Sequence, residues 1–171
     1  MIAPELTELA TVLKKQKKHI TIETAGTILP NGIPCDLASL SPKLSNSTPS
    51  PERDLAWAKK HEATRLQPEV ISEWIRKYPF QLKFVVSSEN DLSEIKSLLS
   101  RLETFVAPPH QSVRGEEGPP VPFHQVLLMP EGVDTQTLST RSPWLVEICK
   151  REGFRFCPRL HIELFGHKRG T

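Results

Sequence analysis

Hydroxyl, ammonium and carboxylate side chains gather in three short segments that each follow a stretch with the pattern of a β-strand. The first is Glu23–Thr27, with the sequence ETAGT, the second ends in Ser41-Pro42-Lys43, and the third is Leu127–Gly132, with the sequence LLMPEG. Hydroxyl groups donate and accept hydrogen bonds, and a lysine ammonium group suits a carboxylate or a ribose. The three segments therefore predict a binding site for a polar ligand.

Each segment also has an ordinary structural interpretation. Glu23–Thr27 fits a simple strand-to-turn transition in which Gly26 permits a close approach of backbone. Lys43 fits a surface lysine, Met129 fits core packing, and Glu131 fits a cap on the following turn. Taken one at a time, the segments leave both interpretations open.

The C-terminal segment, Pro158–Thr171, is unusually apolar for the end of a chain. Leu160, Ile162 and Leu164 alternate with polar residues, which predicts a strand that ties the terminus into the structure. The carboxylate of Thr171 would then be available as a ligand.

Hydrophobic periodicity predicts the elements that position these segments. Helices are expected over Pro4–Leu13, near Pro51, and over Pro68–Lys77, Asp91–Leu102 and Leu138–Glu152, and strands over His19–Thr24, Cys35–Leu40, Phe80–Val86, Val126–Met129 and Phe154–Leu164. This alternation favours an α/β fold with a mostly parallel sheet, in which ligands collect at the C-terminal ends of the strands. The proline-rich stretch Ala107–Pro122 is expected to be an irregular insertion.

Composition narrows the class of protein. The chain has 171 residues, 37% of them apolar, which suits one domain with its own core. A formal charge of +2 is too small to indicate nucleic acid binding, and no apolar run approaches the roughly 20 residues of a membrane span. Cys35, Cys149 and Cys157 are far apart, so we expect reduced thiols in a cytoplasmic protein and no metal site built from them.

In their order and spacing, these segments resemble the 7-carboxy-7-deazaguanine synthase family of radical S-adenosylmethionine enzymes. The resemblance implies a partial (β/α) barrel that uses S-adenosylmethionine, a [4Fe–4S] cluster and Mg²⁺. It implies the conversion of 6-carboxy-5,6,7,8-tetrahydropterin to 7-carboxy-7-deazaguanine in queuosine and 7-deazapurine biosynthesis. A reducing partner such as flavodoxin is implied for the full-length enzyme, and a homodimer is among the states that the resemblance allows.

The resemblance also implies roles for individual residues. Thr24 and the carboxylate of Thr171 would contact the pterin substrate. The S-adenosylmethionine contacts would be Gly26, Ser41, Pro42, Lys43, Met129, Pro130 and Glu131, and no residue of this chain is given a catalytic or metal-binding role.

The sequence departs from the family pattern in one respect, because it contains no CxxxCxxC loop for the cluster. Met1–Leu6 looks like the part of the family sequence that follows a Gly-Gly-Glu-Pro segment. We therefore expect residues 1–171 to be one domain, the C-terminal portion of the barrel, which is inactive and folds poorly in isolation. The alternative is a truncated homologue that binds a ligand or a protein partner without catalysis.

Overall fold

The computed structural model describes residues 2–105 and 121–168. Its centre is a five-stranded parallel sheet whose spatial order, β1-β2-β3-β4-β5, is the order of the strands along the chain. The strands are β1 (Thr21–Thr24), β2 (Leu37–Leu40), β3 (Phe80–Val86), β4 (Val126–Pro130) and β5 (Arg155–Phe156). The expected α/β class with a parallel sheet is therefore confirmed.

Helices lie in the connections from β2 to β5, whereas a loop without a helix joins β1 to β2. The helices are α1 (Pro4–Lys15), α2 (Leu55–Thr64), α3 (Pro68–Lys77), α4 (Asn90–Phe105), α5 (Thr135–Glu152) and α6 (Leu160–Phe165), with short 3₁₀ turns η1 (Ser45–Ser47) and η2 (Phe123–Gln125). Proline at the first turn starts α1 and α3, whereas side chains of Asp54 and Asp134 cap α2 and α5. None of the described helices is long and apolar enough to cross a membrane.

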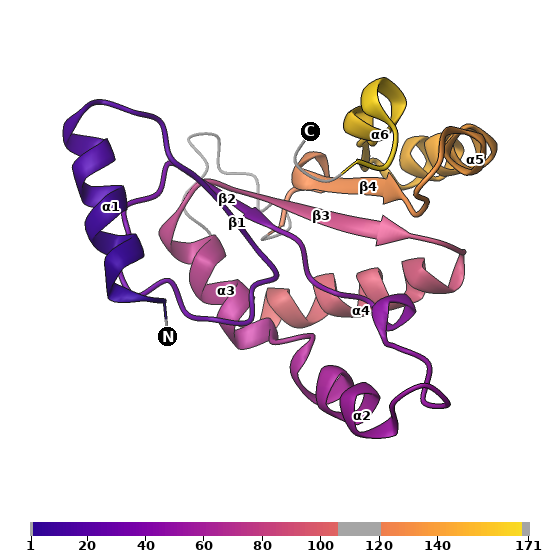
Figure 1. Cartoon of the computed structure of the whole chain (residues 1–171), viewed down its shortest axis with the longest axis horizontal. Helices are drawn as coiled ribbons and strands as arrows, with labels where there is room; N and C mark the ends of the chain where they lie inside the picture. The colour runs from indigo at the N-terminus through magenta and orange to yellow at the C-terminus, as the bar shows by residue number, and fades with distance from the viewer. Residues whose placement is uncertain (1, 106–120, 169–171) are drawn as a thin grey trace.

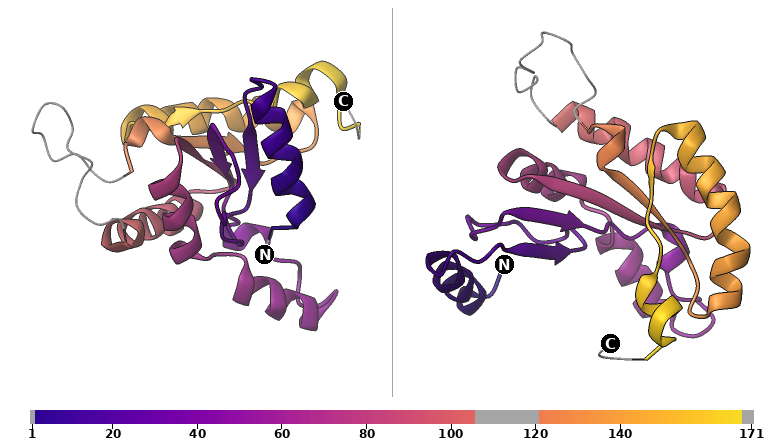
Figure 2. Two further views of the ribbon diagram at one scale, coloured as in Figure 1. Left: turned by 90° about the vertical axis from the view of Figure 1, so that its left-hand side faces the viewer. Right: turned by 90° about the horizontal axis from the view of Figure 1, so that it is seen from above.

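The core lies between the sheet and the helices that follow its strands. Helix α3 contacts β2, α4 contacts β3, and α5 contacts β4 and β5, while α3 and α4 pack on each other (Figure 1). The largest fully buried side chains include Trp74 of α3, Phe84 of β3 and Leu145 of α5. Seen from above in Figure 2, α1 lies beside β1 at one end of the sheet and α5 lies at the other end.

Most predicted elements are confirmed. Helix α3 and strand β3 have the predicted boundaries, and α1, β1, β2, α4, β4 and α5 overlap their predictions closely. The cations Lys14 and Lys15 occupy the last turn of α1, where they complement the helix dipole. The predicted insertion at Ala107–Pro122 lies outside the described residues except for its last two positions.

The predicted terminal strand over Phe154–Leu164 is wrong. Strand β5 has only two residues, and Leu160–Phe165 form helix α6, in which Ile162 is buried while Leu160 and Leu164 are exposed. Residues two apart share a face in a strand, so the burial of Ile162 between the exposed Leu160 and Leu164 fits a helical turn and not a strand. Pro158 has no backbone N–H for the ladder, so the pairing with β4 stops before it.

Candidate functional site

The predicted site residues lie at one edge of the sheet. Thr24 is the last residue of β1, Ser41 directly follows β2, and Met129 and Pro130 end β4. Because all five strands are parallel, these positions share the C-terminal edge, which is where α/β folds bind ligands. Thr171 lies outside the described residues, so its contact stays a prediction.

One cavity at this edge brings four of the predicted residues together. It has a volume of about 250 Å³ and is lined by Ser41, Pro42, Lys43, Leu44, Asn46, Ser47, Val85 and Glu131. Residues from the loop after β2, from β3 and from the end of β4 thus meet in one space. We call it the Lys43 cavity.

The loop after β2 is held in place by its apolar and backbone groups. Pro42 and Leu44 are buried, and the Ser41 amide donates a 2.7 Å hydrogen bond to the carbonyl of Thr24. That bond extends the β1–β2 ladder by one residue beyond the strands. Ser41 and Lys43 are therefore placed by a continuation of the sheet.

Glu131 enters the Lys43 cavity from the end of β4. Its amide donates to the carbonyl of Val86 at 2.9 Å, which continues the β3–β4 pairing. Arg141 of α5 forms an ion pair with the Glu131 carboxylate and also donates to the Glu131 carbonyl at 2.6 Å. Sequence reasoning missed Arg141, because no local pattern shows that its helix turns it back toward β4.

A second polar cavity lies on the other side of Lys43. It has a volume of about 490 Å³ and is lined by Thr27, Lys43, His61, Thr64, Arg65 and Gln67. Lys43 is therefore shared by two cavities. Neither His61 nor Arg65 was identified from the sequence, and a histidine in a short polar helix with an arginine directly after it gives no signal of a site.

Thr24 and Gly26 occupy a different part of the edge. Gly26 has φ of 72°, and a Cβ atom there would lie 2.8 Å from Cγ1 of the buried Ile71. Its amide donates to the Thr24 hydroxyl at 3.2 Å. Glycine is thus required here by the backbone, whatever ligand the loop contacts.

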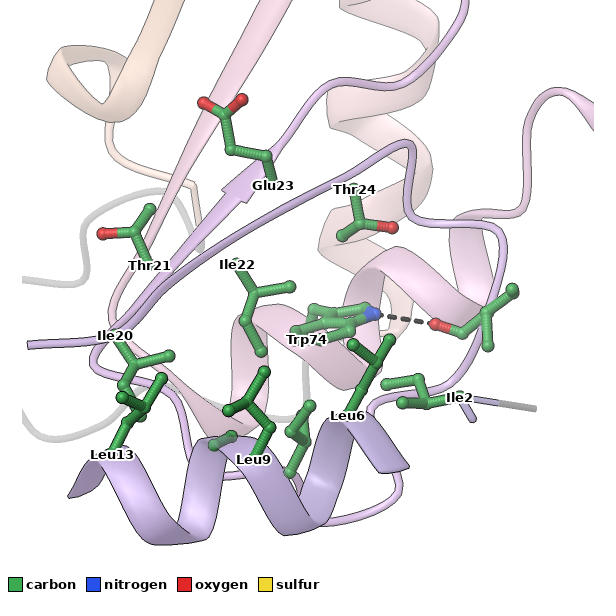
Figure 3. A pocket seen from close by; sticks show the side chains of 13 residues that line it. Ile2, Leu6, Leu9, Leu13, Ile20, Thr21, Ile22, Glu23, Thr24 and Trp74 are labelled. Carbon is green, nitrogen blue, oxygen red and sulfur yellow. Dashed lines mark hydrogen bonds between the residues drawn. The ribbon is translucent and has the colours of Figure 1, made fainter. Parts of the chain in front are cut away.

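Thr24 lines an apolar groove between α1 and β1, with a volume of about 400 Å³. In Figure 3, Leu6 and Leu9 of α1 face Ile22 of β1 across this groove. Trp74 closes it from α3, and its indole N–H donates to the carbonyl of Ile28 at 2.8 Å.

Four of the predicted site residues do not line the Lys43 cavity: Thr24, Gly26, Met129 and Pro130. The predicted site residues are therefore divided between those that line the Lys43 cavity and those that lie outside it.

A row of polar side chains crosses the sheet itself. Lys83 of β3 donates to Glu23 of β1 at 2.7 Å, and Gln81 donates to Ser39 of β2 at 2.9 Å. The hydrogen bond and the charge of Lys83 hold the pKa of Glu23 below its ordinary value. These side chains were not identified from the sequence, although the alternation of β3 places Gln81 and Lys83 on the same face.

No described residues fit an iron–sulfur cluster or a structural metal. Within residues 2–105 and 121–168, no group of three His, Cys, Asp or Glu side chains could hold a metal ion. Cys35, Cys149 and Cys157 are free thiols in separate elements, and burial raises the pKa of Cys149 to about 11. Since cluster ligands are thiolates, this thiol is poorly suited to the role.

Comparison with known proteins adds sequence evidence to this geometry. No protein-family model matches the chain. A 7-carboxy-7-deazaguanine synthase from Rhodopirellula baltica is 36% identical over 172 residues, which cover 100% of this chain and 60% of that protein. One from Halobacterium salinarum is 38% identical over 151 residues, which cover 86% of this chain and 54% of that protein. The chain thus spans just over half the length of these curated relatives. The resemblance drawn from the sequence is therefore confirmed: over its whole length, this chain is similar to part of a 7-carboxy-7-deazaguanine synthase.

Proposed function

We propose that this chain forms the S-adenosylmethionine-binding edge of a 7-carboxy-7-deazaguanine synthase. The observation that carries the proposal is the Lys43 cavity, where Ser41, Pro42 and Lys43 meet Glu131 although the two segments are far apart in the sequence. Similarity to two proteins named as that synthase supports it.

The groups that line the Lys43 cavity fit S-adenosylmethionine chemically. Lys43 would hold the carboxylate of the methionine moiety, and Ser41 and Glu131 would bind hydroxyl or amino groups. Leu44 and Val85 offer an apolar wall against which an adenine ring would pack. S-adenosylmethionine, when bound beside a reduced cluster, supplies the radical that starts this class of reaction.

For the whole protein, we propose the activity of the named relatives, in the cytoplasm, on the pterin 6-carboxy-5,6,7,8-tetrahydropterin. Thr24 would contact that substrate from the end of β1, and the carboxylate of Thr171 would do so from the C-terminus. We further propose Gly26, Met129 and Pro130 as cofactor contacts outside the Lys43 cavity. Within the described residues, no group of three His, Cys, Asp or Glu side chains could hold a metal ion, so the ligands of the [4Fe–4S] cluster are not supplied by this part of the chain. A reducing partner and a homodimer belong to the same proposal for the whole protein.

We also propose that residues 1–171 act as one domain, the C-terminal portion of a partial (β/α) barrel. The single five-stranded sheet and its continuous core support the proposal of one domain.

Titration of the purified chain with S-adenosylmethionine by isothermal calorimetry tests the cofactor site. Lys43→Met should weaken binding by roughly 10- to 150-fold, because a charge-assisted hydrogen bond contributes roughly 1.5–3 kcal/mol. Lys59→Met, at an exposed lysine of α2, is the matched control and should bind normally. If circular dichroism shows that the chain is folded, its failure to bind, or equal binding by the Lys43 variant, would contradict the proposed site.

Sequencing the DNA upstream of the Met1 codon tests the proposal for the whole protein. An open frame that encodes CxxxCxxC would support it, and the full-length product should then be assayed anaerobically. A stop codon directly upstream would instead favour a ligand-binding homologue without catalysis.

A further inference from the structure

The loop that carries Ser41, Pro42 and Lys43 is held from outside by two charged side chains that line no part of the Lys43 cavity. We propose that Arg65, at the end of α2, and Glu94, in α4, are positioning residues that set the loop in its ligand-binding conformation. The inference rests on the proposed function, since it assigns these residues to the same cofactor site.

Arg65 contacts the backbone of the loop directly. Its Nη1 donates a 2.8 Å hydrogen bond to the carbonyl of Lys43 and a 2.6 Å bond to the Glu94 carboxylate. Its Nε donates to Glu62 at 2.9 Å, and the Arg65 side chain is only 9% exposed. The guanidinium plane is therefore fixed on several sides, and so is the carbonyl that it contacts.

Glu94 holds the same loop two residues further on. Its Oε2 accepts hydrogen bonds from the Ser45 amide at 2.9 Å and from the Ser45 hydroxyl at 2.8 Å. Its other oxygen accepts from Arg65. One carboxylate thus joins the two ends of the segment from Lys43 to Ser45.

The side chain of Lys43 depends on this backbone support. Within the described part of the chain, its ammonium group has no hydrogen bond or ion pair that would fix its direction. The position from which the Lys43 side chain extends, between the two cavities that it lines, is therefore set by its backbone, and Arg65 contacts the carbonyl of that same residue.

Arginine is suited to this role in a way that lysine is not. A guanidinium group donates to several acceptors at fixed angles, whereas an ammonium group is a compact point charge on a flexible stem. Arg65→Lys keeps the charge and can keep an ion pair with Glu94, but it cannot reach Glu62, Glu94 and the Lys43 carbonyl together. The substitution therefore separates electrostatic stabilisation from positioning.

The test measures S-adenosylmethionine affinity, melting temperature and amide hydrogen exchange of residues 41–48 in the unaltered chain, Arg65→Lys and Glu94→Gln. The matched control is Lys96→Met, which removes the ion pair between Lys96 of α4 and Glu152 of α5. We expect about tenfold weaker binding and faster exchange in Arg65→Lys, a smaller loss in Glu94→Gln, and unchanged affinity and loop exchange in Lys96→Met even where its melting temperature falls.

Two negative binding results would lead to different conclusions. If the unaltered chain binds S-adenosylmethionine and both variants bind it equally well, the positioning role is overturned while the cofactor site stands. If the unaltered chain does not bind, the cofactor site fails and the positioning role fails with it, and faster exchange in the variants would then report a purely structural loop contact.

Discussion

Lys83 reaches across β2 to donate a hydrogen bond to Glu23, although the two residues lie on strands that are not neighbours in the sheet. The 2.7 Å contact therefore joins β1 to the centre of the sheet through side chains. Glu23 directly precedes Thr24 in β1, and its pKa is lowered by Lys83.

The Lys83→Met variant should raise the pKa of Glu23 toward its ordinary value. In the folded chain the hydrogen bond and charge of Lys83 lower that pKa, so the pair stabilises the fold above the unfolded pKa of about 4.3 and is lost as the pH falls through the folded value. Because the Glu23 side chain is 72% exposed, the contribution to the free energy of unfolding should be only about 0.2–1 kcal/mol. NMR titration of the Glu23 carboxyl carbon checks this, with Lys150→Met as a surface ion-pair control. An unchanged Glu23 titration would contradict the contact.

Gly26→Ala should destabilise the chain more than Gly32→Ala does. Both glycines have positive φ, of 72° and 75°, so alanine at either position costs about 1–2 kcal/mol in backbone strain. A Cβ atom at Gly26 would also meet Ile71 at 2.8 Å, whereas nothing lies within 4 Å at Gly32. We expect the additional overpacking loss to be about 1–3 kcal/mol. Urea denaturation of both variants measures the difference, and equal losses would refute the close approach of the loop to α3.

The thiols should react with iodoacetamide in an order set by burial. Cys149 is buried with its pKa raised to about 11, whereas Cys157 is half-buried. Since the thiolate is the reactive species, Cys157 should be modified well before Cys149 at pH 8. Mass spectrometry of quenched time points resolves the two sites. Comparable rates would show that α5 opens readily around Cys149.

Strand β1 should be a site of aggregation in the isolated chain. Within the described residues it pairs with β2 alone, so its outer backbone edge has no partner strand. A lysine at the exposed Thr21 should reduce aggregation because charge on an edge strand disfavours pairing between molecules. Light scattering at matched concentrations of Thr21→Lys and the control Thr64→Lys, on α2, checks this. An equal effect of both lysines would indicate net charge rather than the edge as the cause.

Local sequence patterns correctly predicted the elements in which all the residues favour the same secondary structure. Pro68 starts α3 and the run Phe80–Val86 forms β3 at the predicted boundaries, because proline position and β-branched content act within each segment. The six residues of α6 were predicted as strand, since the spacing of Leu160, Ile162 and Leu164 does not distinguish a strand from one helical turn.

The candidate site was predictable only in outline. Parallel strands placed Thr24, Ser41 and Glu131 at one edge, as the sequence indicated. Whether they share a cavity depends on the register between strands and on where the helices turn their side chains. The contribution of Val85 to the Lys43 cavity and the contacts of Arg65 and Arg141 depend on those tertiary features.

The agreement between strand order in space and strand order along the chain has a consequence for synthesis on the ribosome. Each described strand after β1 has a partner already present when it emerges, and the helices between β2 and β5 can cover the sheet before the next strand arrives. No described strand has to wait for a later one to be inserted between it and its neighbour. Among the described strands, the sheet can therefore grow in one direction from β1 toward β5, and β5 pairs with β4 through only two residues.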